Sequence, residues 1–316
     1  MPLRTSPDFS RARIADIPGE EIRTAMQGGI IPVITGFQGV TEDLRITTLG
    51  RGGSDTSAVA VAAALKADRC DIYTDVEGVF TADPRLAPRA RKISMIVYEE
   101  MLELASLGAK VLQTRAVVLA MRHNLKLQVL SSFSEKLGSD LPGTLVIPEQ
   151  EAKTMMEEQI VSGIAHSRDE AKITLIGVPD RPGIAAAIFG PLSQGGINVD
   201  MIVQNISANP DLTDLTFTVA RGDAGRAGQA LQEAQAEIGN RDLLIDTEVA
   251  KISVVGMGMR SHTGVAQQMF RTLSEKGINI QVISTSEIKI SVLVQEDYTE
   301  LAVRILHDTY ELDKSE

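Results

Sequence analysis

Short apolar runs alternate with longer helical patterns through the first half of the chain. Three runs have the length and the continuous apolar character of buried strands: residues 29–35 (GIIPVIT), 69–74 (RCDIYT) and 127–131. The segments between them predict an Ala/Val-rich helix at 57–66 and helical stretches over 98–123, broken at Gly108. Short apolar strands joined by helical crossovers are typical of buried parallel sheets, so the predicted fold class is α/β.

The second half contains an internal repeat. Residues 171–173 (AKI) recur at 250–252, and residues 196–198 (GIN) recur at 277–279. Each copy predicts a strand, a helix, two strands and a second helix. This order is typical of ferredoxin-like modules, so the second half is expected to contain two of them.

These patterns predict how the chain is organised. Residues 1–147 are expected to form the α/β part, and the polar residues 148–158 a linker. The first module is predicted over 171–249, with a fourth strand at 243–249. The end of the second copy is too polar for such a strand, so the second module is predicted from 250–316 together with 159–166. The two modules are therefore expected to be interleaved along the chain.

Composition and charge narrow the possible classes of function. The 316 residues include 31 Lys and Arg against 42 Asp and Glu, a net charge of −11 that argues against binding to nucleic acid or to anionic membranes. No stretch approaches the ~20 apolar residues of a membrane span, so a cytoplasmic protein is expected. A single cysteine, Cys70, excludes an intramolecular disulfide and a cysteine-cluster metal site.

A glycine-rich segment, residues 47–57 (TTLGRGGSDTS), leads into the predicted Ala-rich helix. Glycine lets the backbone approach a ligand closely, Ser54 and Asp55 suit a helix N-cap, and a helix N-terminus attracts anions. Arg51 adds a guanidinium that can hold a carboxylate or phosphate through two hydrogen bonds. The Gly-Lys-Ser/Thr of a Walker loop is absent. The segment predicts an anion site, with a tight turn before a capped helix as the alternative.

A second polar segment, residues 74–85 (TDVEGVFTADPR), begins where a predicted strand ends. Ligands of open α/β sheets bind beyond the carboxyl ends of strands, so Thr74, Asp75 and Arg85 are candidate contacts. The Gly and Pro residues of this segment are ordinary turn formers, and a simple loop is the alternative. Lys110 is either a solvated helix residue or a further contact to a polyphosphate.

The first half resembles the aspartate kinase family in four stretches: GIIPVITGFQGVTED (29–43), TTLGRGGSDTSAVAVAAALKAD (47–68), DIYTDVEGVFTADPR (71–85) and EEMLELASLGAKVLQTRAV (99–117). The repeats are similar to the two regulatory ACT modules of that family, in GINVDMIVQNIS (196–207) and GINIQVISTSEIKISVLV (277–294). The resemblance covers about residues 12–312. It implies a partial amino-acid-kinase three-layer α/β/α sandwich followed by two ferredoxin-like βαββαβ ACT modules.

The resemblance also implies a reaction. Members of the family transfer the γ-phosphoryl group of ATP, bound with Mg²⁺, to the β-carboxylate of L-aspartate, the first step toward lysine, threonine and methionine. Lysine and/or threonine act as effectors at the ACT modules, and a homo-oligomer that pairs through these modules is expected.

Site residues follow from the positions that match the family's motifs. The aspartate-binding loop corresponds to Arg51, Gly52, Gly53 and Ser54, and the catalytic roles correspond to Asp55 and Arg51. The ATP-binding positions correspond to Ser54, Thr74, Asp75, Phe80, Thr81, Ala82, Asp83, Arg85 and Lys110, although many members have Tyr where Phe80 stands. The effector-binding positions correspond to Asp180, Asn198, Asp200 and Gln204. No residue is assigned to a metal site of the protein itself.

One motif of the family is absent from this chain. Members begin with a strand that ends in Lys-Phe-Gly-Gly-Thr, whose lysine and glycines bind phosphate. Without that region, strands of the central sheet are expected to be missing, and a sheet edge and apolar surface are expected to be exposed. Two hypotheses follow: a kinase shortened at its N-terminus, or a regulatory subunit that senses amino acids. The intact kinase motifs favour the first, and the isolated chain is predicted to show little turnover.

Overall fold

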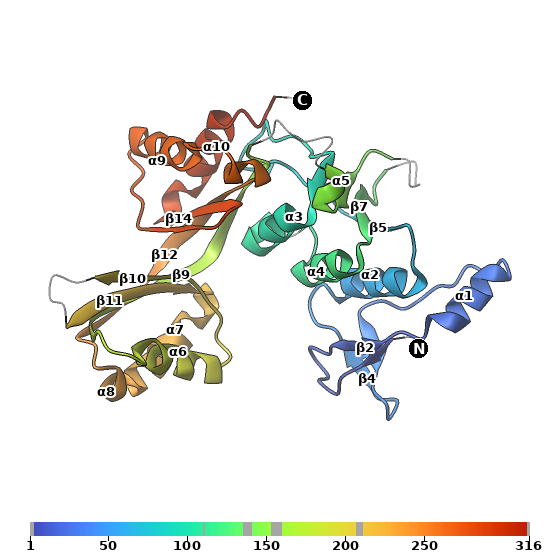
Figure 1. The fold of residues 1–316 in the computed structure, drawn as a ribbon, viewed down its shortest axis with the longest axis horizontal. Helices are drawn as coiled ribbons and strands as arrows, with labels where there is room; N and C mark the ends of the chain where they lie inside the picture. The colour runs from blue at the N-terminus through green and yellow to red at the C-terminus, as the bar shows by residue number, and fades with distance from the viewer. Residues whose placement is uncertain (1–2, 110, 135–140, 153–159, 207–210, 315–316) are drawn as a thin grey trace. The chain divides into compact units, whose positions relative to one another are not determined.

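The structure is a computed structural model that describes residues 3–109, 111–134, 141–152, 160–206 and 211–314. The chain divides into two compact units, whose elements are labelled in Figure 1. Unit 1 comprises Met1–Gly163, Val255–Gly258 and Leu312–Glu316, and unit 2 comprises Ile164–Val254 and Met259–Glu311. The predicted α/β half and the two repeats therefore fall almost entirely into different units.

The first sheet of unit 1 has four short strands in the order β2-β1-β3-β4. Its strands and the two helices around it are β1 (Arg4–Thr5), β2 (Ile14–Asp16), α1 (Gly19–Gln27), β3 (Gln38–Val40), β4 (Ile46–Thr48) and α2 (Gly53–Leu65). A small core of Leu3, Ala12 and Leu49 lies against Val61 of α2. This core anchors the loop between β4 and α2, which contains the glycine-rich segment.

The second sheet of unit 1 has the order β5-β7-β8-β6. The elements of this part are β5 (Arg69–Thr74), β6 (Met95–Val97), α3 (Tyr98–Leu104), η1 (Ala105–Ala109), α4 (Thr114–His123), β7 (Lys126–Ser131), β8 (Thr144–Ile147) and α5 (Glu149–Ala152). β5 and β7 are parallel, with Thr74 opposite Ser131 at their carboxyl ends. The two strands predicted at 69–74 and 127–131 are confirmed, and their carboxyl ends meet at one edge of the sheet.

The strand predicted at 29–35 is wrong. Residues 30–36 have no regular secondary structure, and among the described residues no strand pairs with them. Ile31 and Val33 are 87% and 95% exposed, so this run does not bury its apolar side chains. A single apolar run cannot form a strand without a neighbour, because its backbone N–H and C=O groups need hydrogen-bond partners. Pro32, which has no N–H group, weakens any such pairing further.

The helical region over 98–123 is interrupted more widely than predicted. Helix α3 ends at Leu104 and continues as one π-helical turn, η1, before α4 begins at Thr114. A π-helical turn is rare and is found mostly at functional sites. The predicted break at Gly108 lies within this turn.

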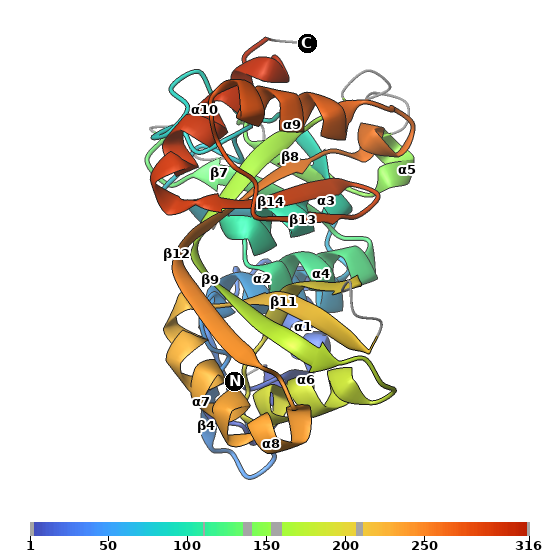
Figure 2. The same cartoon turned by 90° about the vertical axis from the view of Figure 1, so that its left-hand side faces the viewer.

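Both repeats of unit 2 contribute to one six-stranded sheet, in the order β10-β11-β9-β12-β14-β13. The first repeat supplies β9 (Gly163–Pro179), α6 (Ile184–Gln194), β10 (Val199–Ile206), β11 (Leu212–Val219), α7 (Ala224–Glu233) and α8 (Gln235–Ile238). The second supplies β12 (Asp242–Val255), α9 (Val265–Glu275), β13 (Val282–Thr285), β14 (Lys289–Gln295) and α10 (Thr299–Thr309). Short 3₁₀ turns occur at Arg221–Asp223, Met257–Arg260 and Glu296–Tyr298. Figure 2 shows α9 and α10 beside β14, and α6 to α8 beside β9 and β11.

The long strands β9 and β12, of 17 and 14 residues, lie side by side at the centre of this sheet. The N–H of Arg241 donates to the carbonyl of Ile176 (2.8 Å), and the N–H of Ser162 donates to the carbonyl of Val255 (2.8 Å). The two strands therefore run antiparallel, and the segment before the first repeat lies beside the first strand of the second. The predicted module boundary at 249/250 falls inside β12 and stays a prediction, as does the linker, of which 153–158 lie outside the described residues.

The six-stranded sheet folds over itself. β10 and β13 lie close together although they occupy opposite ends of the strand order. Met201, Val249, Val282 and Leu293, from four different strands, form one buried apolar cluster. The two repeats therefore share a small core as well as the paired strands β9 and β12.

Helices that could span a membrane are absent from the part of the chain that the structure describes. No helix there has both the length and the apolar composition needed to cross a membrane.

Candidate functional site

The glycine-rich loop lies at the amino end of α2. Gly50 and Gly52 adopt left-handed backbone conformations, with φ of 81° and 70°. A Cβ atom at Gly52 would lie 1.7 Å from Cγ of Gln113, so glycine allows the loop to approach the segment before α4. Two stretches of chain that are far apart in sequence therefore meet at the start of α2.

The prediction that Ser54 and Asp55 cap the helix is wrong. Gly52 is the N-cap of α2, and it has no side chain with which to bind the free N–H groups. Ser54 and Asp55 lie in the first turn instead, because the left-handed Gly52 ends the loop two residues earlier than the pattern indicated. The N–H of Gly53 donates to the carbonyl of Gly50 (3.0 Å). A helix terminus can attract anions, and the anion site at this segment stays a prediction.

Polar side chains surround this helix terminus. Arg51 and Ser54 are exposed, and Asp55 is half-buried. Burial raises the pKa of Asp55, and a hydrogen bond from the backbone of Gln113 opposes that rise. Arg51 has no ion-pair partner in the part of the chain described, so its guanidinium is available to an anionic ligand.

The predicted nucleotide-binding segment follows β5. Thr74 ends the strand, and its hydroxyl donates to the exposed carboxylate of Asp75 (3.2 Å). Thr81 and Ala82 are buried, and the N–H of Thr81 donates to the carbonyl of Arg91 (2.9 Å). Thr81 and Ala82 can therefore offer little more than backbone atoms to a ligand.

The other residues of this segment are nearer the surface. Phe80 forms an isolated β-bridge with Lys92 and is partly exposed. The exposed guanidinium of Arg85 pairs with the carboxylate of Asp83, at 2.7 Å between Nη2 and Oδ2. Arg85 would have to exchange this partner in order to hold a phosphate.

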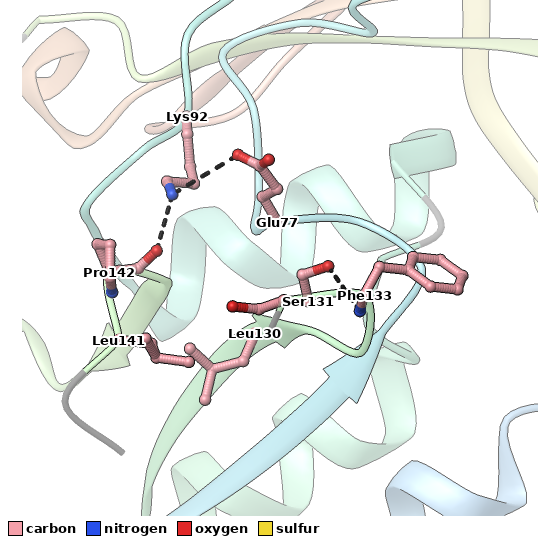
Figure 3. A pocket seen from close by; sticks show the side chains of 8 residues that line it. Glu77, Lys92, Leu130, Ser131, Phe133, Leu141 and Pro142 are labelled. Carbon is pink, nitrogen blue, oxygen red and sulfur yellow. Dashed lines mark hydrogen bonds and ion pairs between the residues drawn. The ribbon is translucent and has the colours of Figure 1, made fainter. Parts of the chain in front are cut away.

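A cavity of about 310 Å³ opens beyond the carboxyl end of β7, beside the loop that follows β5 (Figure 3). Its lining residues are Glu77, Lys92, Leu130, Ser131, Phe133, Ser134, Leu141 and Pro142. Nζ of Lys92 donates to the carbonyl of Pro142 (2.7 Å) and lies 3.9 Å from a carboxylate oxygen of Glu77. Of the predicted nucleotide-binding residues that the structure describes, none lines this cavity, although their neighbour Glu77 does.

The cavity residues were not predicted from the sequence. One signal could have indicated Ser131, because it ends a predicted strand and ligands of open α/β sheets bind beyond the carboxyl ends of strands. Lys92 and Phe133 carry no such local signal. Lys110, the predicted ATP contact on the helical region, lies outside the described residues.

Helix α4 is tied to the glycine-rich loop by Arg115, which sequence reasoning also missed. Its guanidinium donates to the carbonyl of Leu49 (3.1 Å) and to the carbonyl of Ala12 (2.9 Å). The glycine-rich loop is thus contacted by Arg115 of α4 and by Gln113, the residue directly before that helix. Both contacts join segments that are distant in sequence, so no local pattern could have indicated them.

Of the predicted effector residues, Asp200 and Gln204 lie on β10, Asn198 directly precedes that strand, and Asp180 precedes α6. Asn198, Asp200 and Gln204 are exposed, and Asp180 stands in the turn before α6. The strand register shifts between Asp200 and Val203, where Met201 has a left-handed φ of 48°. Such irregularities re-aim side chains and are common next to functional sites. Among the described residues, no hydrogen bond or ion pair joins the other three side chains to that of Asp200.

Lys251 of β12 holds the carboxylate of Asp200. Its Nζ lies 2.9 Å from Oδ2 of Asp200 and 2.7 Å from Oε1 of Glu170. The side chains of Lys251 and Glu170 are 7% and 8% exposed, whereas that of Asp200 is 58% exposed. Burial opposes ionisation of Asp200, but its interactions with Lys251 outweigh burial and hold the pKa of Asp200 below its ordinary value. Asp200 is therefore anionic at neutral pH and open to solvent.

The other repeat has an equivalent contact. Lys172 and Lys251 occupy the same position in the two AKI sequences, and Gln281 occupies the position of Asp200. Nζ of Lys172 donates to Oε1 of Gln281. The repeats exchange equivalent contacts, but the first repeat has a carboxylate where the second has a neutral amide. The repeated lysine was a visible signal that sequence reasoning did not use.

Known protein families match both parts of the chain. The amino acid kinase family matches residues 3–131, and the ACT domain matches residues 173–235 and 252–310. An aspartate kinase of Pseudomonas fluorescens (strain SBW25) is 55% identical over 311 residues, which cover 98% of this chain and 73% of the relative. An aspartokinase of Pseudomonas aeruginosa is 54% identical, over 98% of this chain and 74% of the relative.

Solved structures agree with these matches. Escherichia coli aspartokinase III in complex with aspartate and ADP (R-state) gives a TM-score of 0.79 at 29% identity, over 98% of this chain and 68% of that one. The same protein with lysine and aspartate (T-state) gives a TM-score of 0.73, over 98% and 67% of the two chains. The expected fold, part of an amino-acid-kinase domain followed by ACT modules, is confirmed. The chain belongs to the aspartate kinase family.

Proposed function

We propose that unit 1 binds L-aspartate and MgATP and transfers the γ-phosphoryl group of ATP to the β-carboxylate of aspartate. The observation that carries this proposal is the amino end of α2. There, an unpaired Arg51 and an exposed Ser54 lie next to the half-buried Asp55, and the N-cap Gly52 provides no side chain that would cover the helix terminus. A helix terminus with an adjacent free guanidinium suits a substrate that carries carboxylates.

The proposed reaction needs no general base. An oxygen of the β-carboxylate forms a bond to the γ-phosphorus while the bond from that phosphorus to the ADP oxygen breaks, giving aspartyl phosphate and ADP. The attacking carboxylate is already ionised near pH 7. The protein therefore contributes positioning and the neutralisation of negative charge. Arg51 would hold aspartate through two hydrogen bonds, and Asp55 would orient the reacting groups.

We place the nucleotide at the sheet edge formed by the ends of β5 and β7. Thr74, Asp75 and the backbone around Thr81 follow β5 there, and Arg85 would exchange Asp83 for a phosphate. The nearby cavity has the size of a small-molecule site, and Leu130, Phe133 and Pro142 give it an apolar wall that suits a base. Mg²⁺ would enter with ATP, held by phosphates and one or two carboxylates.

For unit 2 we propose binding of an amino-acid effector, lysine and/or threonine. The carboxylate of Asp200 is anionic and exposed, so it can accept hydrogen bonds from the ammonium group of a free amino acid. Inhibition of the kinase by lysine and/or threonine fits the proposed reaction, because that reaction is the first step in the synthesis of lysine, threonine and methionine. Pairing of the ACT modules of two chains would give a homo-oligomer.

Binding and transfer are tested separately on the whole chain. Calorimetric titrations with L-aspartate and with MgADP are expected to show one site for each. Hydroxylamine added to a mixture with MgATP and aspartate traps aspartyl phosphate as a coloured hydroxamate. Binding of both ligands with ATP-dependent hydroxamate, even at the low rate expected of this chain without the Lys-Phe-Gly-Gly-Thr motif, supports the proposal. Binding without hydroxamate rejects the transfer step and favours the regulatory hypothesis, and absence of binding rejects the whole proposal.

Replacing Asp200 by Ala is expected to weaken lysine or threonine binding about tenfold or more, because a hydrogen bond to a charged group contributes ~1.5–3 kcal/mol. Lys251 keeps Glu170 as a partner in this variant, so unit 2 should stay folded. Calorimetry measures the affinity. The matched control is Gln281→Ala at the equivalent position of the second repeat. Unchanged affinity in Asp200→Ala would remove this residue from the effector site.

A further inference from the structure

The chain passes between the units at four places, and two of the connecting segments are joined to each other. The outgoing segment connects unit 1 to β9 through Ser162 and Gly163. The returning segment connects β12 to unit 1 through Val255 and the residues that follow. The N–H of Ser162 donates to the carbonyl of Val255 at 2.8 Å. A Cβ atom at Gly256 would lie 2.3 Å from the carbonyl oxygen of Ile160, so no side chain fits between the segments there. Movement of one crossing segment therefore carries the other with it.

A single buried carboxylate holds both crossing segments to helix α3. Glu100 lies in the first turn of α3 and is 2% exposed. Its Oε1 accepts a hydrogen bond from the hydroxyl of Ser162 (2.6 Å) and another from the N–H of Met257 (2.7 Å). One oxygen atom thus connects the helix to the outgoing and the returning chain.

A contribution to the stability of the fold does not by itself explain why a carboxyl group is buried at position 100. Oε2 of Glu100 is buried and has no hydrogen-bond partner in the described part of the chain. Burial also raises the pKa of Glu100. Burying an ionisable group that has an oxygen without a hydrogen-bond partner costs free energy. A carboxylate at this position is better explained by what it connects.

One crossing segment approaches the loop around Thr81, which belongs to the proposed nucleotide site. Helix α3 continues into the π-helical turn η1, which ends directly before Lys110. At Gly163, a Cβ atom would lie 3.1 Å from the carbonyl oxygen of Thr81 and 3.6 Å from Cδ2 of Leu104. A shift of the crossing segments would therefore press on the loop around Thr81 and, through Glu100, pull on α3.

We propose that Glu100 is a positioning residue that couples effector binding in unit 2 to nucleotide affinity in unit 1. The inference rests on the proposed function, because it needs a nucleotide in unit 1 and an amino acid in unit 2. Glu100 contacts neither ligand. It transmits a displacement of the paired crossing segments to the helix that leads to Lys110. Coupling between two ligand sites typically changes each affinity by a factor of about 5–150.

The test measures the dissociation constant of MgADP by calorimetry, without amino acids and with saturating L-lysine plus L-threonine. In the wild-type chain the amino acids are expected to change this constant about fivefold or more. Glu100→Met keeps the size of the side chain but removes the acceptor, and the change is expected to fall below about twofold. Glu100→Gln restores an acceptor oxygen and is expected to restore most of the coupling.

Two further variants make the result specific. Glu99→Met removes a carboxylate from the same helical turn and is expected to leave the coupling intact. Ser162→Ala removes one of the two hydrogen bonds to Glu100 without changing a buried charge. This variant is expected to weaken the coupling at least twofold. It takes the place of Glu100→Met if Glu100→Met does not fold. Coupling that survives in Glu100→Met overturns the inference. If Glu100→Met does not fold, coupling that survives in Ser162→Ala overturns it instead. A wild-type chain in which both ligands bind without affecting each other overturns it as well. A wild-type chain that binds no MgADP rejects the proposed function itself, and this inference with it.

Discussion

Replacing Lys251 by Met should lower the free energy of unfolding of the chain by about 3–5 kcal/mol, the usual cost of removing one partner of a buried ion pair. The ammonium group lies between Glu170 and Asp200, and the Glu170 carboxylate is almost fully buried. Without Lys251, the buried carboxylate of Glu170 loses its ion-pair partner. Unfolding in urea, followed by circular dichroism, measures the change.

The second repeat supplies a matched control. Lys172 stands at the equivalent position, but it pairs with the neutral Gln281 and, at 3.7 Å, with the partly exposed Asp246. Lys172→Met should therefore cost about 1 kcal/mol or less. Glu170→Gln added to Lys251→Met should recover much of the loss, because it removes the unpaired charge. Equal costs for the two lysine variants would show that the cluster of Lys251, Glu170 and Asp200 has no special role in stability.

The pH dependence follows from the same cluster. Burial alone would lower the pKa of Lys251, but Glu170 and Asp200 raise it above its ordinary value of 10.5. Its contribution to stability is therefore fully present below pH 10.5 and is lost as the pH rises through the higher folded value. The lowered pKa of Asp200 makes its contribution present above the ordinary value of 3.8 and lost as the pH falls through the lower folded value. The contributions of Lys251 and Asp200 to the stability of the wild-type chain should thus be nearly constant between about pH 5 and 9.

The second large effect is expected for aspartate binding. Arg51→Ala should weaken the affinity for L-aspartate by about 100-fold, since two hydrogen bonds to a charged group at ~1.5 kcal/mol each amount to ~3 kcal/mol. Arg51 is exposed and lies between two left-handed glycines, with no ion-pair partner in the described part of the chain. Its removal should therefore leave the melting temperature unchanged. Calorimetric titration with L-aspartate measures the affinity.

Two variants separate charge from geometry in this experiment. Arg51→Lys keeps the positive charge but loses the planar fork, and it should recover only part of the affinity. Arg85→Ala removes a guanidinium that is already paired with Asp83, and it should leave aspartate binding unchanged while weakening MgADP. Aspartate affinity within about threefold of wild type in Arg51→Ala would place the substrate elsewhere.

The local sequence pattern was sufficient to predict those strands and helices that pair with a neighbouring element of this structure and bury their apolar side chains. The apolar runs at 69–74 and 127–131 became β5 and β7, because each provides a neighbour for the other. The repeat predicted the order of strands and helices in both modules, since equal spacing of glycine and apolar residues produces equal local structure. The glycine-rich loop was recognised for a similar reason, because its glycines at left-handed φ are a local requirement.

The tertiary structure alone decided how these pieces meet. The run at 29–35 has the composition of a strand, yet it is exposed and irregular, because strand formation requires hydrogen-bond partners that composition does not provide. The contact between Gly52 and Gln113, the cluster around Lys251 and the hydrogen bonds of Glu100 each join segments that are distant in sequence. Periodicity describes which face of an element is buried, but it carries no information about which distant residue lies opposite. The sequence by itself therefore determined the fold class, the repeat and the candidate motifs, whereas the charge pairs and the connections between sites came from packing.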